Sequence, residues 1–212
     1  MSEKSVPSLR RGPYLVTREE SDDARLIAVV SAALRGGVVA LQYRDKSADA
    51  ARRLRQARAL VALAANWGVP VIVNDDPELA LAAGAAGVHL GEHDAGQGHA
   101  RRLLGAEALI GVSCYDQLER ARDAVRGGAS YVAFGSFFAS PTKPGARRAS
   151  IALLEQSTGL GLPRVAIGGI SRDNAAPLIA AGADLVAVIS AIWDADDPEA
   201  EARALARLFV PS

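Results

Sequence analysis

The chain has a single cysteine, Cys114, so it can form no disulfide within itself. We therefore expect a protein of a reducing compartment, the cytoplasm. No apolar run approaches the roughly 20 residues that a membrane-spanning helix needs. Arg18 and the two glutamates after it interrupt the short apolar run from Tyr14, so no signal-peptide core follows Arg10 and Arg11. The sequence predicts neither a membrane span nor a signal peptide.

An excess of charge of one sign is also missing. Lysine and arginine together number 24, as do aspartate and glutamate, which gives a formal net charge of zero. A surface that binds nucleic acid usually carries a clear excess of basic residues, so we expect no nucleic-acid partner. A local cationic pocket remains compatible with this balance.

Short apolar, often β-branched runs alternate with stretches rich in Ala, Leu and Arg along the 212 residues. The predicted strands are Tyr14–Thr17, Val38–Arg44, Pro70–Asn74, Gly87–Gly91, Leu109–Ser113, Tyr131–Gly135, Arg164–Gly168 and Leu185–Ser190. The predicted helices are Asp22–Arg35, Ala48–Trp67, Pro77–Ala83, Gln97–Leu104, Asp116–Arg126, Ser150–Gln156, Asp173–Ala181 and Pro198–Phe209. Near-continuous apolar strands are typical of parallel sheets buried on both faces.

Eight such units predict a single α/β domain, a (β/α)8 TIM barrel over residues 13–212, after a flexible lead-in of residues 1–12. An open doubly wound sheet is the alternative. That fold more often carries a G-x-G-x-x-G turn after its first strand, and no such turn occurs here. In a barrel, functional side chains are expected at the carboxyl ends of the strands.

Polar residues spaced by two end the second predicted strand. Gln42, Arg44 and Lys46 face the same way while the chain stays extended, toward the mouth of the barrel. Arginine offers a planar fork and lysine a point charge, so this group suits a diphosphate. The alternative is a triplet of solvated surface residues.

Carboxylates follow the third and fourth strands. Asp75 and Asp94 are expected at one opening, where two carboxylates near a cationic group suit Mg²⁺ bridged to a diphosphate. Asp76 lies directly before Pro77 and is predicted to cap the helix instead. Glu92 is left open between a metal ligand and a capping residue.

The fifth and sixth strands lead into further polar groups. Ser113 is a candidate hydrogen-bond donor, whereas no His and Asp stand at spacings that would make it a nucleophile. The longest loop, Ser136–Ala149, is expected to bind ligand. Within it Lys143 is the candidate anion contact, and Arg147 is predicted to be solvated.

Gly168 and Gly169 end the seventh strand, and Ile189 and Ser190 end the eighth. Barrels often hold a phosphate on backbone N–H groups there, so these residues predict a monophosphate subsite. His89 is expected to be a polar residue of the barrel interior. Two anion subsites would suit an enzyme that joins a diphosphate-activated electrophile to a phosphorylated nucleophile.

The chain resembles thiamine-phosphate synthases in the motifs that follow its strands, from about Tyr14 to Phe209. These motifs are L-Q-Y-R-D-K, V-N-D-D, H-L-G-E-H-D, G-V-S, S-P-T-K, A-I-G-G-I and V-I-S, in the order of the family. The resemblance implies a Mg²⁺-dependent transferase that couples a pyrimidine diphosphate to a thiazole phosphate, with or without a carboxylate. Small molecules would be its substrates, and a homo-oligomer is left open.

The resemblance also implies a role for each site residue. The pyrimidine diphosphate would contact Gln42, Arg44, Lys46, Asn74, Ser113 and Lys143, and Asp75 and Asp94 would hold the metal. Arg44, Lys46 and Lys143 would act catalytically. The thiazole phosphate would contact Ser140, Thr142, Gly168, Gly169, Ile189 and Ser190.

Three residues depart from the family pattern: Glu92 replaces a common Gln, Tyr115 a common His, and Ser140 a common Thr. None removes an expected ligand. Two alternatives on the same fold are a thiazole tautomerase-like barrel, which needs no metal, and a non-catalytic barrel that binds a phosphorylated ligand.

Overall fold

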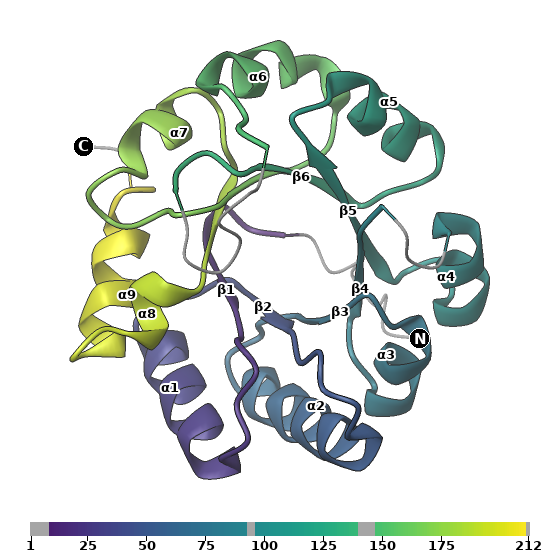
Figure 1. The fold of residues 1–212 in the computed structure, drawn as a ribbon, viewed down its shortest axis with the longest axis vertical. Helices are drawn as coiled ribbons and strands as arrows, with labels where there is room; N and C mark the ends of the chain where they lie inside the picture. The colour runs from purple at the N-terminus through teal and green to yellow at the C-terminus, as the bar shows by residue number, and fades with distance from the viewer. Residues whose placement is uncertain (1–8, 93–95, 140–146, 211–212) are drawn as a thin grey trace, which may run out of the picture.

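The computed structural model describes residues 9–92, 96–139 and 147–210, which form a closed barrel of parallel strands in chain order (Figure 1). The strands are β1 (Gly12–Val16), β2 (Ala40–Tyr43), β3 (Val71–Asn74), β4 (Gly87–Leu90), β5 (Leu109–Tyr115), β6 (Tyr131–Gly135), β7 (Arg164–Ile167) and β8 (Leu185–Val188). β1 pairs with β8, which closes the barrel. The predicted TIM-barrel fold is confirmed.

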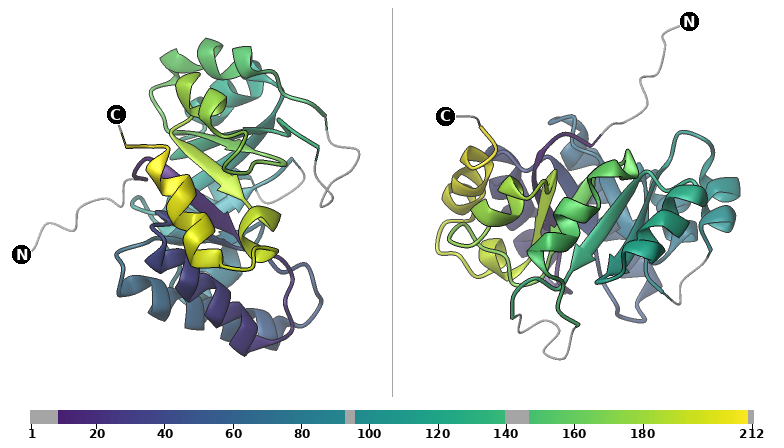
Figure 2. Two further views of the ribbon diagram at one scale, coloured as in Figure 1. Left: turned by 90° about the vertical axis from the view of Figure 1, so that its left-hand side faces the viewer. Right: turned by 90° about the horizontal axis from the view of Figure 1, so that it is seen from above.

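Helices surround the strands, as the two side views of Figure 2 also show. They are α1 (Asp23–Arg35), α2 (Ala50–Ala65), α3 (Pro77–Ala83), α4 (Gln97–Leu104), α5 (Leu118–Arg126), α6 (Ile151–Gln156), α7 (Ala176–Ala180), α8 (Ser190–Trp193) and α9 (Pro198–Arg207), with a 3-10 helix η1 (Thr158–Leu160). Within the described residues, no helix has the length and apolar character needed to cross a bilayer.

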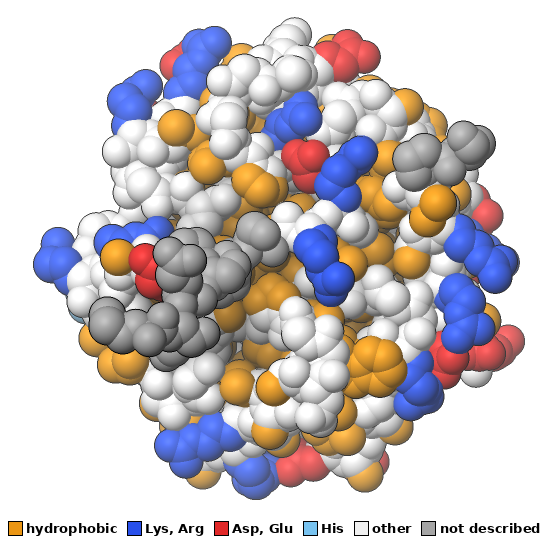
Figure 3. Space-filling view, turned by 180° about the vertical axis from the view of Figure 1, so that it is seen from behind, with side chains coloured by type: hydrophobic (Ala, Val, Ile, Leu, Met, Phe, Trp, Pro, Cys, Tyr) orange, Lys and Arg blue, Asp and Glu red, His pale blue; other side chains and the backbone are white. Residues whose placement is uncertain are grey.

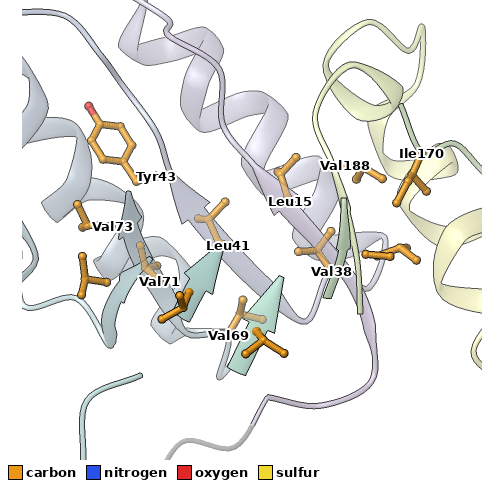
Figure 4. Close-up of a cluster of buried hydrophobic side chains, with 14 of the residues drawn as sticks. Leu15, Val38, Leu41, Tyr43, Val69, Val71, Val73, Ile170 and Val188 are labelled. Carbon is orange, nitrogen blue, oxygen red and sulfur yellow. The ribbon is translucent and has the colours of Figure 1, made fainter. Parts of the chain in front are cut away.

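Side chains alternate along each strand between the barrel interior and the layer beneath the helices. In β1, Leu15 belongs to the outer layer, whereas Tyr14 and Val16 belong to the inner cluster. Part of the outer layer is drawn in Figure 4, with Leu15, Leu41, Tyr43, Val71, Val73 and Val188 among its labelled side chains. This alternation carries inward-facing polar residues up to the mouth of the barrel.

The eighth strand is shorter than predicted. It ends at Val188, and the backbone of Ile189 leaves the extended conformation at φ −120°, ψ −85°. The amide of Trp193 then donates to the carbonyl of Ile189 at 3.0 Å, which closes a turn of α8. Ser190 therefore begins a short helix. The sequence pattern predicts a strand there instead, because the apolar run continues through residue 189.

The predicted cap at Asp76 is confirmed. Its side chain accepts a hydrogen bond from the amide of Leu79 at 2.8 Å, and Pro77 occupies the first helical position. Arg53 on α2 also pairs with Asp76 at 2.8 Å.

Figure 3 shows the face of the barrel opposite to the one seen in Figure 1. On this face basic and acidic side chains are interspersed.

Candidate active site

A cavity of about 370 Å³ lies inside the barrel and at the carboxyl ends of the strands. All eight strands, or the loops after them, contribute to its wall. The lining residues are Tyr14, Val16, Gln42, Arg44, Asn74, His89, Glu92, Ser113, Tyr115, Ala133, Gly135, Ser136, Arg147, Val165, Ile167, Gly168, Ala187 and Ile189. TIM-barrel enzymes hold their active sites at this end of the barrel.

The cavity brings together six of the fourteen predicted site residues. The predicted residues in its wall are Gln42, Arg44, Asn74, Ser113, Gly168 and Ile189. Four others, Lys46, Asp75, Gly169 and Ser190, lie near these in the chain but are not part of the wall. The remaining four, Asp94, Ser140, Thr142 and Lys143, lie outside the described residues.

The backbone of Arg44 is fixed by a buried threonine at the end of β1. The amide of Arg44 donates to the Thr17 hydroxyl oxygen at 2.8 Å, and that hydroxyl donates to the Arg44 carbonyl at 3.2 Å. The amide of Thr17 in turn donates to the carbonyl of Gln42 at 2.8 Å. Arg44 thus enters the cavity from a backbone held on both sides.

Asp45 anchors the same segment from the outer side of the barrel. Its side chain is 1% exposed, accepts from the amide of Ser47 at 2.7 Å, and pairs with Arg52 on α2 at 3.2 Å. Burial alone would raise the pKa of Asp45, but the hydrogen bonds from Ser47 and the charge of Arg52 lower it overall. Asp45 therefore stays ionised and ties the loop after β2 to α2.

Lys46 and Asp75 lie together at the rim. Lys46 Nζ is 3.1 Å from Asp75 Oδ2, so the predicted diphosphate contact and the predicted metal ligand form an ion pair. Asp75 has a positive φ of 66° and its amide donates to the carbonyl of His89 at 2.8 Å. A residue other than glycine rarely adopts this conformation, and such strain gathers at functional sites.

Five polar side chains form a hydrogen-bonded chain across the barrel. Gln42 Nε2 donates to the Tyr14 hydroxyl at 3.1 Å, and that hydroxyl lies 2.9 Å from the Tyr131 hydroxyl. Tyr131 lies 2.9 Å from His89 Nδ1, and His89 Nε2 lies 2.9 Å from Ser113 Oγ. The prediction that His89 is an interior polar residue is confirmed.

The two tyrosines were missed by the sequence analysis because each lies in an apolar strand and reads as core. Burial raises the pKa of Tyr14 to about 12 and that of Tyr131 well above its ordinary value. Both hydroxyls therefore remain protonated at neutral pH. The available signal was a hydroxyl-bearing side chain at an inward position of a barrel strand.

The absence of a side chain at Gly168 permits a close approach, but the group that approaches it in this structure is Ser136. A Cβ at Gly168, where φ is +107°, would lie 2.0 Å from Ser136 Oγ, and one at Gly169 would lie 2.2 Å from the carbonyl oxygen of Ala139. The carbonyl of Gly168 accepts from the amide of Phe138 at 2.9 Å. The two glycines therefore let the segment after β6 dock on the end of β7.

Arg147 was predicted to be solvated, and it is exposed, yet it also lines the cavity. Its carbonyl accepts from the amide of Ser136 at 3.0 Å, which places it beside the end of β6.

Glu92 and Tyr115, two of the three departures from the family pattern, line the cavity as well. Cys114 is fully buried, and burial raises its pKa to about 12, so its role is in packing.

Comparison with known proteins agrees with this geometry. The family model described as thiamine monophosphate synthase matches residues 13–192. A thiamine-phosphate synthase of Thiobacillus denitrificans is 57% identical over 93% of this chain and 94% of its own. Another from Chromobacterium violaceum is 55% identical over 96% and 99% of the two chains.

A solved structure agrees as well. The thiamine phosphate pyrophosphorylase of Pyrococcus furiosus superposes with a TM-score of 0.84 and 32% identity, over 94% of this chain and 96% of that one. The barrel, the cavity at the strand ends and these relatives lead to one conclusion. The chain belongs to the thiamine-phosphate synthase family, transferases of thiamine biosynthesis.

Proposed function

We propose that this transferase joins 4-amino-5-hydroxymethyl-2-methylpyrimidine diphosphate to a thiazole phosphate, with or without a 2-carboxylate, and releases thiamine phosphate and diphosphate. The observation that carries the proposal is the composition of the cavity wall. The side-chain amides of Gln42 and Asn74 come from β2 and β3 and Arg44 directly follows β2, whereas Gly168 and Ile189 follow β7 and β8. We propose that these two edges of one cavity bind the two anions.

The binding roles follow from these edges. We propose that the pyrimidine diphosphate contacts Gln42, Arg44, Lys46, Asn74, Ser113 and Lys143. We propose that the thiazole phosphate contacts Ser140, Thr142, Gly168, Gly169, Ile189 and Ser190. Barrel enzymes commonly hold a phosphate after strands 7 and 8, which supports the second assignment.

The proposed reaction is a dissociative substitution. The bond between the methylene carbon and the diphosphate oxygen breaks, and its electron pair leaves with the diphosphate. The aminopyrimidine ring stabilises the methylene cation, and the lone pair of the thiazole nitrogen then forms the new carbon–nitrogen bond. Arg44, Lys46 and Lys143 neutralise the charge on the leaving group, and positioning of the thiazole supplies much of the remaining acceleration.

We also propose Mg²⁺ as the cofactor, held by Asp75 and Asp94. The chemistry of Asp75 fits this ion, because a carboxylate oxygen at the rim beside Lys46 is the hard donor that Mg²⁺ takes. The Mg²⁺ ion, when bound, would offset charge on the diphosphate.

Replacement of both Asp75 and Asp94 by asparagine tests this assignment. We expect the Mg²⁺-dependent rate to fall by about 100-fold or more, because the ion loses both of its charged ligands. The rate is measured against Mg²⁺ concentration, with Asp123→Asn on α5 as the matched control. A double variant with a normal Mg²⁺ titration would contradict the metal site.

Thr17→Val tests how Arg44 is positioned. The variant keeps the shape of the side chain but leaves two backbone groups of Arg44 without their hydroxyl partner, a loss of about 1–3 kcal/mol. We expect about a tenfold rise in KM for the pyrimidine diphosphate, and Thr17→Ser, which keeps the hydroxyl, should stay near wild type. Equal behaviour of the two variants would contradict this role.

The reaction itself is tested by product mass. Purified protein is incubated with both substrates, with and without Mg²⁺, and analysed by liquid chromatography–mass spectrometry. We expect thiamine phosphate only when Mg²⁺ is present. Metal-free isomerisation of the thiazole phosphate would instead identify a tautomerase-like barrel, and ligand binding without turnover a binding protein; either result overturns the proposal.

A further inference from the structure

The hydrogen-bonded chain from Gln42 to Ser113 joins two residues of the proposed pyrimidine edge through three side chains that have no assigned role. Tyr14 on β1, Tyr131 on β6 and His89 on β4 form its middle. All three are buried and line or underlie the cavity. Each of these side chains has one hydrogen to donate, so all hydrogen bonds of the chain can run the same way. A group at one end that can only donate then decides which way they run.

The direction follows from the first link. Gln42 Nε2 is a donor only, so the Tyr14 hydroxyl must accept from it and use its own hydrogen elsewhere. The neighbouring oxygen is that of Tyr131, which then accepts from Tyr14 and donates to His89 Nδ1. In the opposite direction, the hydrogen of Tyr14 would face the amide hydrogens of Gln42.

The remaining hydrogen bonds determine the tautomer of the His89 imidazole. His89 accepts at Nδ1, so the neutral ring carries its hydrogen on Nε2 and donates it to Ser113 Oγ. Ser113 has one hydroxyl hydrogen, and with its oxygen already accepting, that hydrogen is left to point into the cavity that Ser113 lines.

We propose that Tyr131 is a positioning residue that holds His89 as its Nε2–H tautomer and thereby orients the hydroxyl hydrogen of Ser113 toward the substrate. The orientation suits an electron-rich acceptor, either a ring nitrogen or a diphosphate oxygen of the pyrimidine substrate. This part of the proposal rests on the proposed function, whereas the tautomer of His89 does not.

Gly111 supplies independent support. It lies on β5 between the strands of Tyr131 and His89 and pairs in register with both residues. A Cβ at Gly111 would lie 2.0 Å from Tyr131 Cζ and 2.5 Å from His89 Nδ1. The missing side chain is therefore what lets tyrosine and histidine meet across an intervening strand, with their rings stacked at 5.5 Å.

The neutral state of both tyrosines keeps the direction fixed. Burial raises the pKa of each hydroxyl, so neither loses the hydrogen that it passes along the chain near neutral pH. Each buried hydroxyl also has both a donor and an acceptor partner, as a buried polar network requires.

The tautomer is measured directly by nitrogen NMR on the full chain labelled with ¹⁵N-histidine. The chain has three histidines, so the His89 signals are identified by their loss in His89→Asn. At about pH 8, above the ordinary histidine pKa of about 6.5, we expect the hydrogen on Nε2. A hydrogen on Nδ1 would overturn the proposed direction.

Removal of one tyrosine hydroxyl at a time shows which of them determines the tautomer of His89. In Tyr131→Phe, Nδ1 loses its donor and we expect a mixture of both tautomers. In Tyr14→Phe, Tyr131 can still donate, so the Nε2–H form should persist. Tyr43→Phe is the matched control, because Tyr43 is an equally buried tyrosine that bonds to Gln56 on the outer side of the barrel. An unchanged tautomer in Tyr131→Phe would overturn the proposal.

Kinetics test the link to Ser113. We expect Tyr131→Phe to lower kcat/KM about tenfold in the wild-type background, and no more than about twofold when Ser113 is already alanine. Equal losses in both backgrounds would show a merely structural effect and overturn the positioning role. The NMR result stands whether or not the chain catalyses the proposed coupling, so failure of one proposal is distinguishable from failure of the other.

Discussion

Arg44→Ala is expected to lower kcat/KM for the coupling reaction by about 100-fold or more. Arg44 directly follows β2 and lines the cavity, and Thr17 holds its backbone on both sides. A guanidinium that meets charge developing on a leaving diphosphate typically contributes that much in a site partly shielded from water. The effect is measured in steady-state kinetics with each substrate varied in turn.

Two further variants separate charge from geometry. Arg44→Lys keeps the charge but loses the planar fork, so we expect an intermediate loss. Arg58→Ala on α2 removes an arginine that donates to the carbonyl of Ala82 outside the barrel, and activity should remain. An Arg44→Ala variant as active as Arg58→Ala would remove Arg44 from the site.

Gly168→Ala is expected to raise the KM for the thiazole phosphate by about 10- to 100-fold. The new Cβ would lie 2.0 Å from Ser136 Oγ, and at a φ of +107° any side chain is strained, at a cost of about 1–3 kcal/mol. The end of β7 and the segment docked on it must therefore move apart. The KM for each substrate and the thermal midpoint are measured together.

The matched control is Gly159→Ala, because a Cβ there would meet nothing within 4 Å. We expect it to leave both KM values unchanged. The two substrates also serve as controls for each other, since the pyrimidine edge on β2 and β3 lies away from Gly168. An equal rise in both KM values would show general damage to the barrel and contradict the assignment of this edge to the thiazole phosphate.

The barrel could be predicted because its signals are local. Each strand is a short apolar run followed by a helical stretch, and spacing by two placed Gln42 and Arg44 on one face. The cap at Asp76 needed only the proline after it. These features depend on residues within a few positions of one another, which sequence patterns record directly.

The rest depends on contacts between distant residues. Gly168 meets Ser136, and Tyr14 meets Tyr131 across 117 positions, so neither partner carries a signal of the other. Ser190 was placed in a strand because Ile189 continues the apolar run, although its backbone turns into α8. The local sequence pattern predicts which side chains of a strand face inward. It does not predict which of those side chains form hydrogen bonds with one another.

A crystal structure with Mg²⁺, diphosphate and thiamine phosphate bound tests the central claim most directly. We predict the diphosphate against Arg44 and Lys46, with the phosphate of the product at the ends of β7 and β8 beside Gly168. The newly formed bond between the two rings would then lie within the cavity. Diphosphate at the Gly168 edge, or both anions outside the cavity, would contradict the two-edge arrangement.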